Sequence, residues 1–383
     1  MGALSSTFNR FFESEKSGGI LLIVCTALSL VLANSPLSPE YLGFWRRNGG
    51  GMSLEHWVND GLMAIFFLLI GLELERELYV GELSDFKNAL LPIVAAVGGM
   101  LAPALIHFSL NGGTPTQAGF GIPMATDIAF ALGVLAILGN RIPAPLKVFV
   151  VAFAVIDDLG AIVIIAAFYT ARLSFWYLAG ALAVWTLLIA LNRIFRVMSL
   201  IPYLLGGAMM WFLMLKSGVH ATIAGVMLAF AIPFTARDDD ERSPSHRLEH
   251  FLHKPAAFFI LPTFALANTG VVVGTDWMQD ITSANSVGIA AGLIAGKPLG
   301  VTLLCFAAVA SGMCRLPPDV GWSHMMGAGI LGGIGFTMSI FIANLAFAGH
   351  PETINAAKMA ILLASLTAGM AGFLWLRLQR PTA

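Results

Sequence analysis

Charged side chains are scarce in this 383-residue sequence. Asp, Glu, Lys and Arg make up only 11% of it and hydrophobic residues 57%, whereas a soluble globular chain usually carries about 25% charged residues. A water-soluble protein of this composition could not cover its surface with polar groups. The composition therefore indicates an integral membrane protein surrounded by the lipid bilayer. The net charge of −1 provides no basic surface, so we expect no nucleic-acid partner.

Cysteine is also rare. Cys25, Cys305 and Cys314 have no metal-ligand spacing and are too few for a disulfide framework. We expect them to be apolar side chains in or near membrane spans. The sequence has no soluble domain, low-complexity tail or short-period repeat, so we expect one polytopic membrane domain over residues 1–383, without a cofactor.

Apolar segments long enough to cross a bilayer occupy most of the chain. A transmembrane helix needs about 20 apolar residues. Cutting the sequence at polar, glycine and proline clusters predicts an all-α protein with about twelve spans, near residues 17–34, 57–80, 89–110, 117–138, 146–170, 174–192, 200–215, 217–234, 251–271, 285–310, 323–347 and 353–377. Spans seven and eight are short and poorly separated around Lys216, so eleven spans are an alternative.

Lysine and arginine are distributed unevenly between the predicted loops. With the N-terminus in the cytoplasm, twelve spans place about three times as many of the 21 basic residues on the cytoplasmic side as outside. The positive-inside rule therefore predicts that both termini are cytoplasmic. Residues 35–56 become an external loop, which contains the basic pair Arg46 and Arg47, and residues 235–250 become a cytoplasmic loop.

A few charged residues fall inside these spans. A charge at membrane depth costs about 3 kcal/mol on insertion scales, so such residues usually face a cavity and are paired. Asp127 lies in span four, Asp157 and Asp158 in span five ("FAVIDDLGAIVIIAAF"), and Lys297 in span ten. Neighbouring residues on a helix point about 100° apart, so one of the adjacent aspartates can bind a cation while the other turns toward a partner such as Lys297. A purely structural set of ion pairs is the alternative.

Glycine and proline interrupt two of the spans. Span four reads "GFGIPMATDIAFALG" and span eleven reads "MGAGILGGIGFTMSIFIA". This pattern predicts two broken helices that meet at the membrane midplane; close packing through small residues is the alternative. We expect Asp127 to offset the positive ends of the half-helices and Lys297 the negative ends. Asp157 and Asp158 then remain for a hard cation or a proton.

Six motifs, in this order, resemble those of the bacterial Na⁺/H⁺ antiporter family NhaA. They are "PMATDIAFALGVLA", "VIDDLGAI", "LKSGVHATIAGV", "LPTFALANTGV", "GKPLG" and "GGIGFTMSIFIA". The resemblance extends over nearly the whole chain, from about residue 12 to 377. It implies the NhaA fold, with inverted repeats formed by helices 3–5 and 10–12 and with crossed, interrupted helices four and eleven. It also implies export of Na⁺, or of Li⁺ as a close mimic, across a bacterial inner membrane in exchange for more than one inward H⁺.

The resemblance also implies roles for individual residues. Asp158 matches the main Na⁺-coordinating carboxylate and Asp157 its neighbour in binding and proton exchange, while Thr126 and Asp127 match the crossing in span four. A pH response is implied for Glu73, Arg76, Glu77, His220, Arg247, Glu249, His250 and His253. The loop at residues 45–58 matches the segment through which family members form homodimers, although its "RRNGGG" is unlike the family.

Other functions are compatible with single features. An intramembrane aspartyl protease also uses paired aspartates, but it needs them on different helices, and a Na⁺-coupled symporter needs a roomier polar site. His246 to His250 satisfy the metalloprotease pattern H-x-x-E-H, without an evident further ligand. His246, His250 and His253 share a helix face and could sense pH; the alternative is that protons simply compete with Na⁺ at Asp157 and Asp158.

Overall fold

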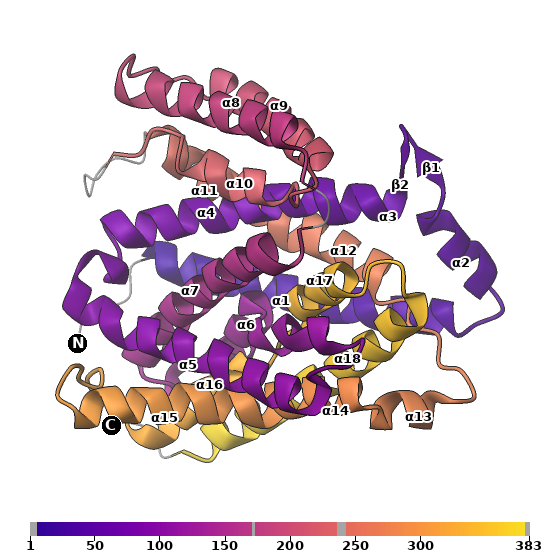
Figure 1. The fold of residues 1–383 in the computed structure, drawn as a ribbon. Helices are drawn as coiled ribbons and strands as arrows, with labels where there is room; N and C mark the ends of the chain where they lie inside the picture. The colour runs from indigo at the N-terminus through magenta and orange to yellow at the C-terminus, as the bar shows by residue number, and fades with distance from the viewer. Residues whose placement is uncertain (1–5, 171–172, 236–242, 380–383) are drawn as a thin grey trace. The chain divides into compact units, whose positions relative to one another are not determined.

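The computed structural model describes residues 6–170, 173–235 and 243–379 (Figure 1). Its elements fall into two compact units, each described here by itself. The first unit is formed by α1 (Ser6–Ala33), α5 (Phe86–Asn111), η3 (Gln117–Met124), α6 (Ile128–Leu138), η4 (Gly139–Arg141), most of α7 (Ala144–Phe168), α13 (Trp277–Thr282), α14 (Ala284–Ala291), η6 (Gly292–Gly296), α15 (Lys297–Ala310), α16 (Trp322–Gly332), α17 (Phe336–Ala346) and α18 (Pro351–Arg377).

The second unit contains the remaining elements, except for the first two residues of α2 and the last residue of α12. They are α2 (Ser38–Trp45), β1 (Asn48–Gly49), β2 (Met52–Ser53), α3 (Leu54–His56), η1 (Trp57–Leu62), α4 (Met63–Tyr79), η2 (Glu82–Ser84), α8 (Phe175–Arg193), α9 (Leu200–Ser217), α10 (Ile223–Ala229), α11 (Pro244–Pro255), η5 (Ala256–Ile260) and α12 (Leu261–Asn268). Within this unit α4 packs against α10, and α8 and α9 run side by side (Figure 1).

Long apolar helices confirm the all-α membrane class. Among the described residues, eight helices are long and apolar enough to span a bilayer, or nine if the bent pair α16 and α17 counts as one span. Three predicted spans fall outside this count. Span one corresponds to the shorter apolar helix at 17–33, span eight to α10, and span nine to the last residues of α11 with η5 and α12.

The predicted bounds of span eight were wrong. Span eight was predicted at 217–234, but Gly218 has a left-handed φ of +85° that ends α9, and only Ile223–Ala229 is α-helical beyond the following turn. Within the predicted loop 235–250, α11 begins at Pro244. Ser243 caps this helix by accepting a hydrogen bond from the His246 N–H, and Pro244 suits a first helical turn. Residues 236–242 lie outside the described part.

Close helix packing in the first unit depends on glycine. Helix α5 packs along α15 (Figure 1), and Gly98 and Gly300 face each other at this contact. A Cβ on Gly300 would lie 2.8 Å from the Gly98 carbonyl carbon, which is backbone and cannot rotate away. The absence of side chains at these two positions therefore sets the distance between α5 and the helix that begins at Lys297.

We expect Gly300→Ala to destabilise the first unit by about 1–3 kcal/mol, because the added methyl overpacks a backbone contact. Thermal unfolding of the purified protein in detergent measures the effect. Gly133→Ala is the matched control: Gly133 lies inside α6, where an added Cβ would meet nothing within 4 Å, so alanine there should be neutral or stabilising. Equal melting temperatures for both variants would contradict the packing argument.

The external loop predicted at residues 35–56 contains secondary structure. Strands β1 and β2 pair antiparallel, with Asn48 opposite Ser53. Gly50 and Gly51 form the turn with φ of +69° and +93°, values that a two-residue hairpin turn requires and that glycine adopts without strain. The unusual "RRNGGG" sequence is therefore compatible with a tight hairpin.

Candidate ion-binding site

The two adjacent aspartates of α7 lie in the interior of the first unit. Asp157 is fully buried and Asp158 is 1% exposed. The Lys297 ammonium donates a hydrogen bond of 2.7 Å to Oδ2 of Asp157 and another to the Met124 carbonyl. Asp158 also interacts electrostatically with Lys297. The structure thus brings three of the predicted charges together and pairs the lysine directly with Asp157.

The local backbone places Lys297 at this point. The five residues before it form η6, a π-helical turn, and Pro298 after it has no N–H to donate. A Cβ on Gly296 would lie 2.8 Å from the Pro103 Cα, so glycine permits the approach to α5. The ammonium also lies 5.6 Å from the centre of the Phe153 ring, where a cation is attracted to the ring face.

Both glycine-rich spans are interrupted in the structure. Residues 125–127 separate η3 from α6, and residues 333–335 separate α16 from α17, which are bent by 46°. The two breaks touch, because the Asp127 N–H donates to the Ile334 carbonyl over 2.6 Å. Close approach of these breaks exposes four helix ends to one another inside the unit.

Asp127 connects the N-terminal ends of two half-helices. Its Oδ1 caps α6 by accepting from the Phe130 N–H at 3.1 Å. Its Oδ2 accepts from the N–H and the hydroxyl of Thr337, in the first turn of α17. A carboxylate is favourable where two helix N-termini bring partial positive charge together.

Carbonyl groups at the opposite ends of the breaks also have donors. The Met124 carbonyl ends η3 and accepts from Lys297, while the Gly332 carbonyl ends α16 and accepts from the Thr126 hydroxyl at 2.8 Å. Thr126 is fully buried. The cationic and hydroxyl donors therefore meet the negative helix ends.

Sequence reasoning missed Thr337 as a member of this site. Its signal was present: it is a polar residue two positions after Gly335 in the break of span eleven. The contribution of the Met124 carbonyl had no such signal, because a backbone acceptor can come from any residue and is identified only by the tertiary structure.

A second cluster of charges lies in the second unit, between α4 and α11. Arg76 donates to Glu249 over 2.9 Å and lies 3.4 Å from Glu77. The His253 ring lies 3.5 Å from Glu73 and 3.7 Å from Glu249. The structure thus brings together five of the residues for which a pH response was expected.

Three other expected residues lie outside this cluster. Arg247 and His250 are exposed on α11, and His220 contacts the Tyr169 carbonyl at 2.8 Å instead. His246, on the same face as His253, lies 4.0 Å from Glu249. The histidine face of α11 is therefore represented in the cluster by His246 and His253, with His250 at its exposed edge.

Glu249 is the centre of this cluster. Burial by itself raises the pKa of its carboxyl, but the interaction with His253 and the charges of Arg76 and His246 outweigh burial, so that the pKa lies below its usual value. A carboxyl whose pKa is lower in the folded protein than in the unfolded protein stabilises the fold at pH values above its unfolded pKa. This contribution is lost as the pH falls through its folded pKa. Glu249 therefore stays ionised at neutral pH.

Glu75 was not expected in this region. It is 3% exposed and accepts a hydrogen bond of 3.0 Å from the Ser245 hydroxyl in the first turn of α11. Its position between Glu73 and Arg76 in "GLELEREL" gave no indication that its side chain would contact Ser245 and not the residues that Glu73 and Arg76 contact. This bond connects α4 to the start of the helix that carries Glu249.

Comparison with known proteins identifies the family of the chain. The sequence profile of the family described as Na⁺/H⁺ antiporter 1 matches residues 9–376. Proteins named Na(+)/H(+) antiporter NhaA are similar along their length: that of Dechloromonas aromatica is 70% identical (97% of this chain and 96% of the relative), and that of Mesorhizobium japonicum 50% (96% and 93%). The Na(+)/H(+) antiporter NhaA 1 of Flavobacterium johnsoniae is 57% identical (98% and 97%). The chain therefore belongs to the Na⁺/H⁺ antiporter family NhaA.

Proposed function

We propose that this protein is a secondary transporter that exports Na⁺, or Li⁺ in its place, in exchange for inward protons. The family and the names of the relatives support this proposal. The cations are cargo and no resident cofactor is needed. Asp158 is the main Na⁺-coordinating residue, Asp157 takes part in binding and proton exchange, and Thr126 supplies an oxygen near the break.

The charge balance of the buried site carries this proposal. Asp157 and Asp158 bring two negative charges, and Lys297 offsets one of them. Asp127 is matched separately by the N-terminal ends of α6 and α17. When all three are ionised, Asp157, Asp158 and Lys297 together carry a net charge of −1 in a buried environment, where a net charge is unfavourable. Na⁺ and protons both neutralise these carboxylates, so the two cations exclude each other, as exchange requires.

We propose a stoichiometry of two protons per Na⁺. A Na⁺ ion that contacts both carboxylates competes with Lys297 for Asp157. On the return step, one proton on Asp158 and one on Asp157 replace the ion. Each cycle then moves one net positive charge inward, so that the membrane potential helps to drive Na⁺ out; one charge across 100 mV supplies about 2.3 kcal/mol.

The finer architecture is also proposed from the family. We place twelve spans in a bacterial inner membrane with both termini cytoplasmic, helices 3–5 and 10–12 as inverted repeats, and the interrupted segments as a crossing near the midplane. The contact between Asp127 and Ile334 supports the crossing. We further propose a homodimer through residues 45–58, where strand β1 of the hairpin is exposed.

Purified protein in vesicles with an acidic lumen tests the function. Addition of Na⁺ alone should dissipate the pH gradient, and addition of Li⁺ alone should do the same. Holding the membrane potential at zero with valinomycin and K⁺ should change the rate or the endpoint of this dissipation. No response to Na⁺ would refute antiport, whereas a response that ignores the potential at every pH would refute only the two-proton stoichiometry.

We propose that the cluster around Glu249 makes exchange pH-dependent. Gain of a proton by His253 would strengthen its ion pair with Glu73 of α4 and, within α11, its pair with Glu249. Competition between protons and Na⁺ at Asp157 and Asp158 is the alternative source of pH dependence. It needs no residue outside the ion site.

The pH profile of exchange at increasing Na⁺ separates the two mechanisms. Competition alone shifts the profile to lower pH by about one unit per tenfold Na⁺ if one proton competes. If a separate sensor exists, exchange still stops at acid pH however much Na⁺ is present. We then expect Glu249→Ala to change the pH at which exchange stops. His250→Ala is the control, because His250 lies on the same helix but outside the cluster. An unmoved profile in Glu249→Ala would leave competition as the whole mechanism.

A further inference from the structure

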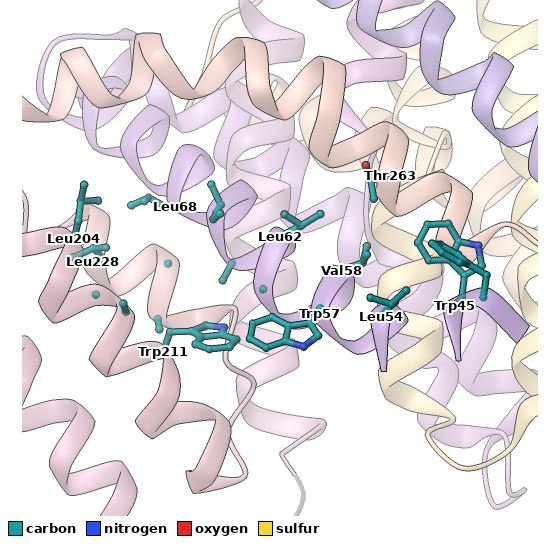
Figure 2. A pocket seen from close by; sticks show the side chains of 18 residues that line it. Trp45, Leu54, Trp57, Val58, Leu62, Leu68, Leu204, Trp211, Leu228 and Thr263 are labelled. Carbon is teal, nitrogen blue, oxygen red and sulfur yellow. The ribbon is translucent and has the colours of Figure 1, made fainter. Parts of the chain in front are cut away.

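No charged side chain of the described residues lines the cavity of the second unit. This cavity has a volume of about 740 Å³, and its lining side chains are apolar apart from the Thr263 hydroxyl and the indole nitrogens of three tryptophans (Figure 2). A different chemistry occurs on α11, where the sequence "HRLEH" places histidines at positions 246 and 250 and a glutamate at 249. This segment has the residue types of a metal site, and ion exchange at Asp157 and Asp158 does not require it.

His246, Glu249 and His250 lie next to one another on the surface of α11. Their positions are i, i+3 and i+4, and residues three and four positions apart are neighbours on a helix. Two histidines four positions apart on one helix face can bind the same Zn²⁺ ion. Imidazole nitrogen and carboxylate oxygen are both common ligands of divalent transition metals. The spacing therefore provides three candidate ligands on neighbouring positions of one helix.

One oxygen of the Glu249 carboxylate lacks a donor. Its Oε1 accepts a hydrogen bond of 2.9 Å from Arg76, whereas its Oε2 is buried and accepts none from the described residues. Nδ1 of His246 lies 4.0 Å from Oε2, which is beyond hydrogen-bonding distance. A buried carboxylate oxygen without a donor is unfavourable, so a cation that reaches Oε2 would be stabilised there.

The separation between Oε2 and the His246 ring suits a metal ion. Zn²⁺ lies about 2.0–2.1 Å from a histidine nitrogen and about 2.0–2.2 Å from a carboxylate oxygen, so two such ligands of one ion lie at most about 4.3 Å apart. The observed 4.0 Å is within this limit. Because the His246 side chain is 34% exposed, an ion from solution can bind the ring first and reach Oε2 as the ring turns.

His250 has to turn to complete the site. In the part of the chain that the structure describes, no three His, Cys, Asp or Glu side chains are already gathered as a metal site requires. His250 is exposed, and exposed side chains change rotamer on the picosecond-to-nanosecond timescale. Its ring can therefore rotate toward His246 when an ion binds, so that the set of ligands forms on binding.

The charge around this site favours a divalent cation. Three carboxylates and one guanidinium form the neighbouring cluster, those of Glu73, Glu77, Glu249 and Arg76. When all four are ionised and the histidines are neutral, as metal coordination requires, three negative charges and one positive charge give a net charge of −2. A divalent ion offsets this charge. Arg247 and Lys254 of α11 are exposed, so that solvent and salt screen their charges.

We propose that His246, Glu249 and His250 bind one divalent transition-metal ion such as Zn²⁺ from the surrounding solution. One nitrogen of each histidine and Oε2 of Glu249 coordinate the ion, and water completes a tetrahedral shell. The ion is not a resident cofactor, and a chelator removes it. Its effect on transport rests on the proposed function: if the cluster around Glu249 sets the pH at which exchange stops, the bound ion changes this pH. With a chelator present, His250 stays outside that cluster.

Isothermal titration calorimetry with Zn²⁺ alone tests the proposal. The full-length protein, without a polyhistidine tag and freed of metal with a chelator, is titrated in detergent at slightly alkaline pH, where histidine is neutral. We expect one bound ion per chain, and we expect His246→Ala, Glu249→Gln and His250→Ala each to weaken binding by at least about tenfold. His350→Gln is the matched control. It removes an exposed histidine at the start of α18, in the first unit, and should leave the affinity unchanged.

Equal affinity in the unaltered protein and in either His246→Ala or His250→Ala would overturn the proposal. Several weakly bound ions, whose number also falls in His350→Gln, would overturn it as well, because they would show adventitious association with exposed histidines. His250 is exposed, so His250→Ala should fold and decides the matter even if Glu249→Gln does not fold. Calorimetry does not depend on transport, so that failure of antiport in vesicles would leave this result unaffected.

Discussion

Asp158→Asn should abolish Na⁺/H⁺ exchange while leaving the protein folded. An amide has the shape of the carboxylate, but it neither releases a proton nor provides the charge that Na⁺ needs. The pair formed by Lys297 and Asp157 is untouched by this substitution. Because the variant keeps the shape of the side chain and removes one charge from a buried site, where charge is costly, we expect no loss of stability.

Proteoliposomes with an imposed pH gradient measure the first part of this prediction. Addition of Na⁺ should produce no dequenching of a pH-sensitive dye at any pH, and thermal unfolding in detergent should match that of the unaltered protein. Asp158→Glu keeps the charge and serves as the control, with residual exchange expected. Normal exchange by a correctly inserted Asp158→Asn protein would refute the assignment of the ion to this residue.

The charged residues of the first unit were accessible from the sequence because charges are rare in membrane spans. Their cost at membrane depth singled out Asp127, Asp157, Asp158 and Lys297, and the geometry of adjacent helix positions predicted that the two aspartates have different neighbours. The structure pairs Asp157 with Lys297. Roles in transport remain predictions, since they depend on bound ions and on other conformations.

Contacts made by the backbone could not be predicted in this way. The Met124 carbonyl and the Thr337 N–H take part because residues 124–127 and 332–337 meet in space. Every residue has a carbonyl and nearly every one an N–H, so the sequence contains no local signal for the pair that meets. Glycine and proline predicted where the helices break, but not which groups the breaks bring together.

Amphipathic periodicity was too coarse for the second unit. His246, His250 and His253 share a face by spacing, yet a face is broad and His250 lies at its exposed edge. Hydropathy likewise predicted span eight as continuous through 217–234, where the chain instead turns after Gly218. In both cases the sequence pattern identified the region, but it did not predict the exposed position of His250 or the turn after Gly218.

Removal of Lys297 should destabilise the protein more than any other single substitution proposed for the first unit. Lys297→Met leaves the Asp157 carboxylate buried without its partner and removes the donor to the Met124 carbonyl. Breaking a buried ion pair by removing one member typically costs about 3–5 kcal/mol. Asp157→Asn should also be strongly destabilising, because it leaves the ammonium buried against an amide.

The double variant Asp157→Asn, Lys297→Met distinguishes loss of the pair from loss of shape. With no charge left at either position, the uncompensated-charge penalty disappears, so the double variant should be more stable than Lys297→Met alone. A coupling free energy well above the roughly 0.5 kcal/mol expected of independent sites is then obtained from the double-mutant cycle. Thermal unfolding in detergent, followed by the fraction of monodisperse protein, provides all four values. Additive losses would show that the two residues act independently, and the direct pairing at 2.7 Å would then not be what holds α7 to α15.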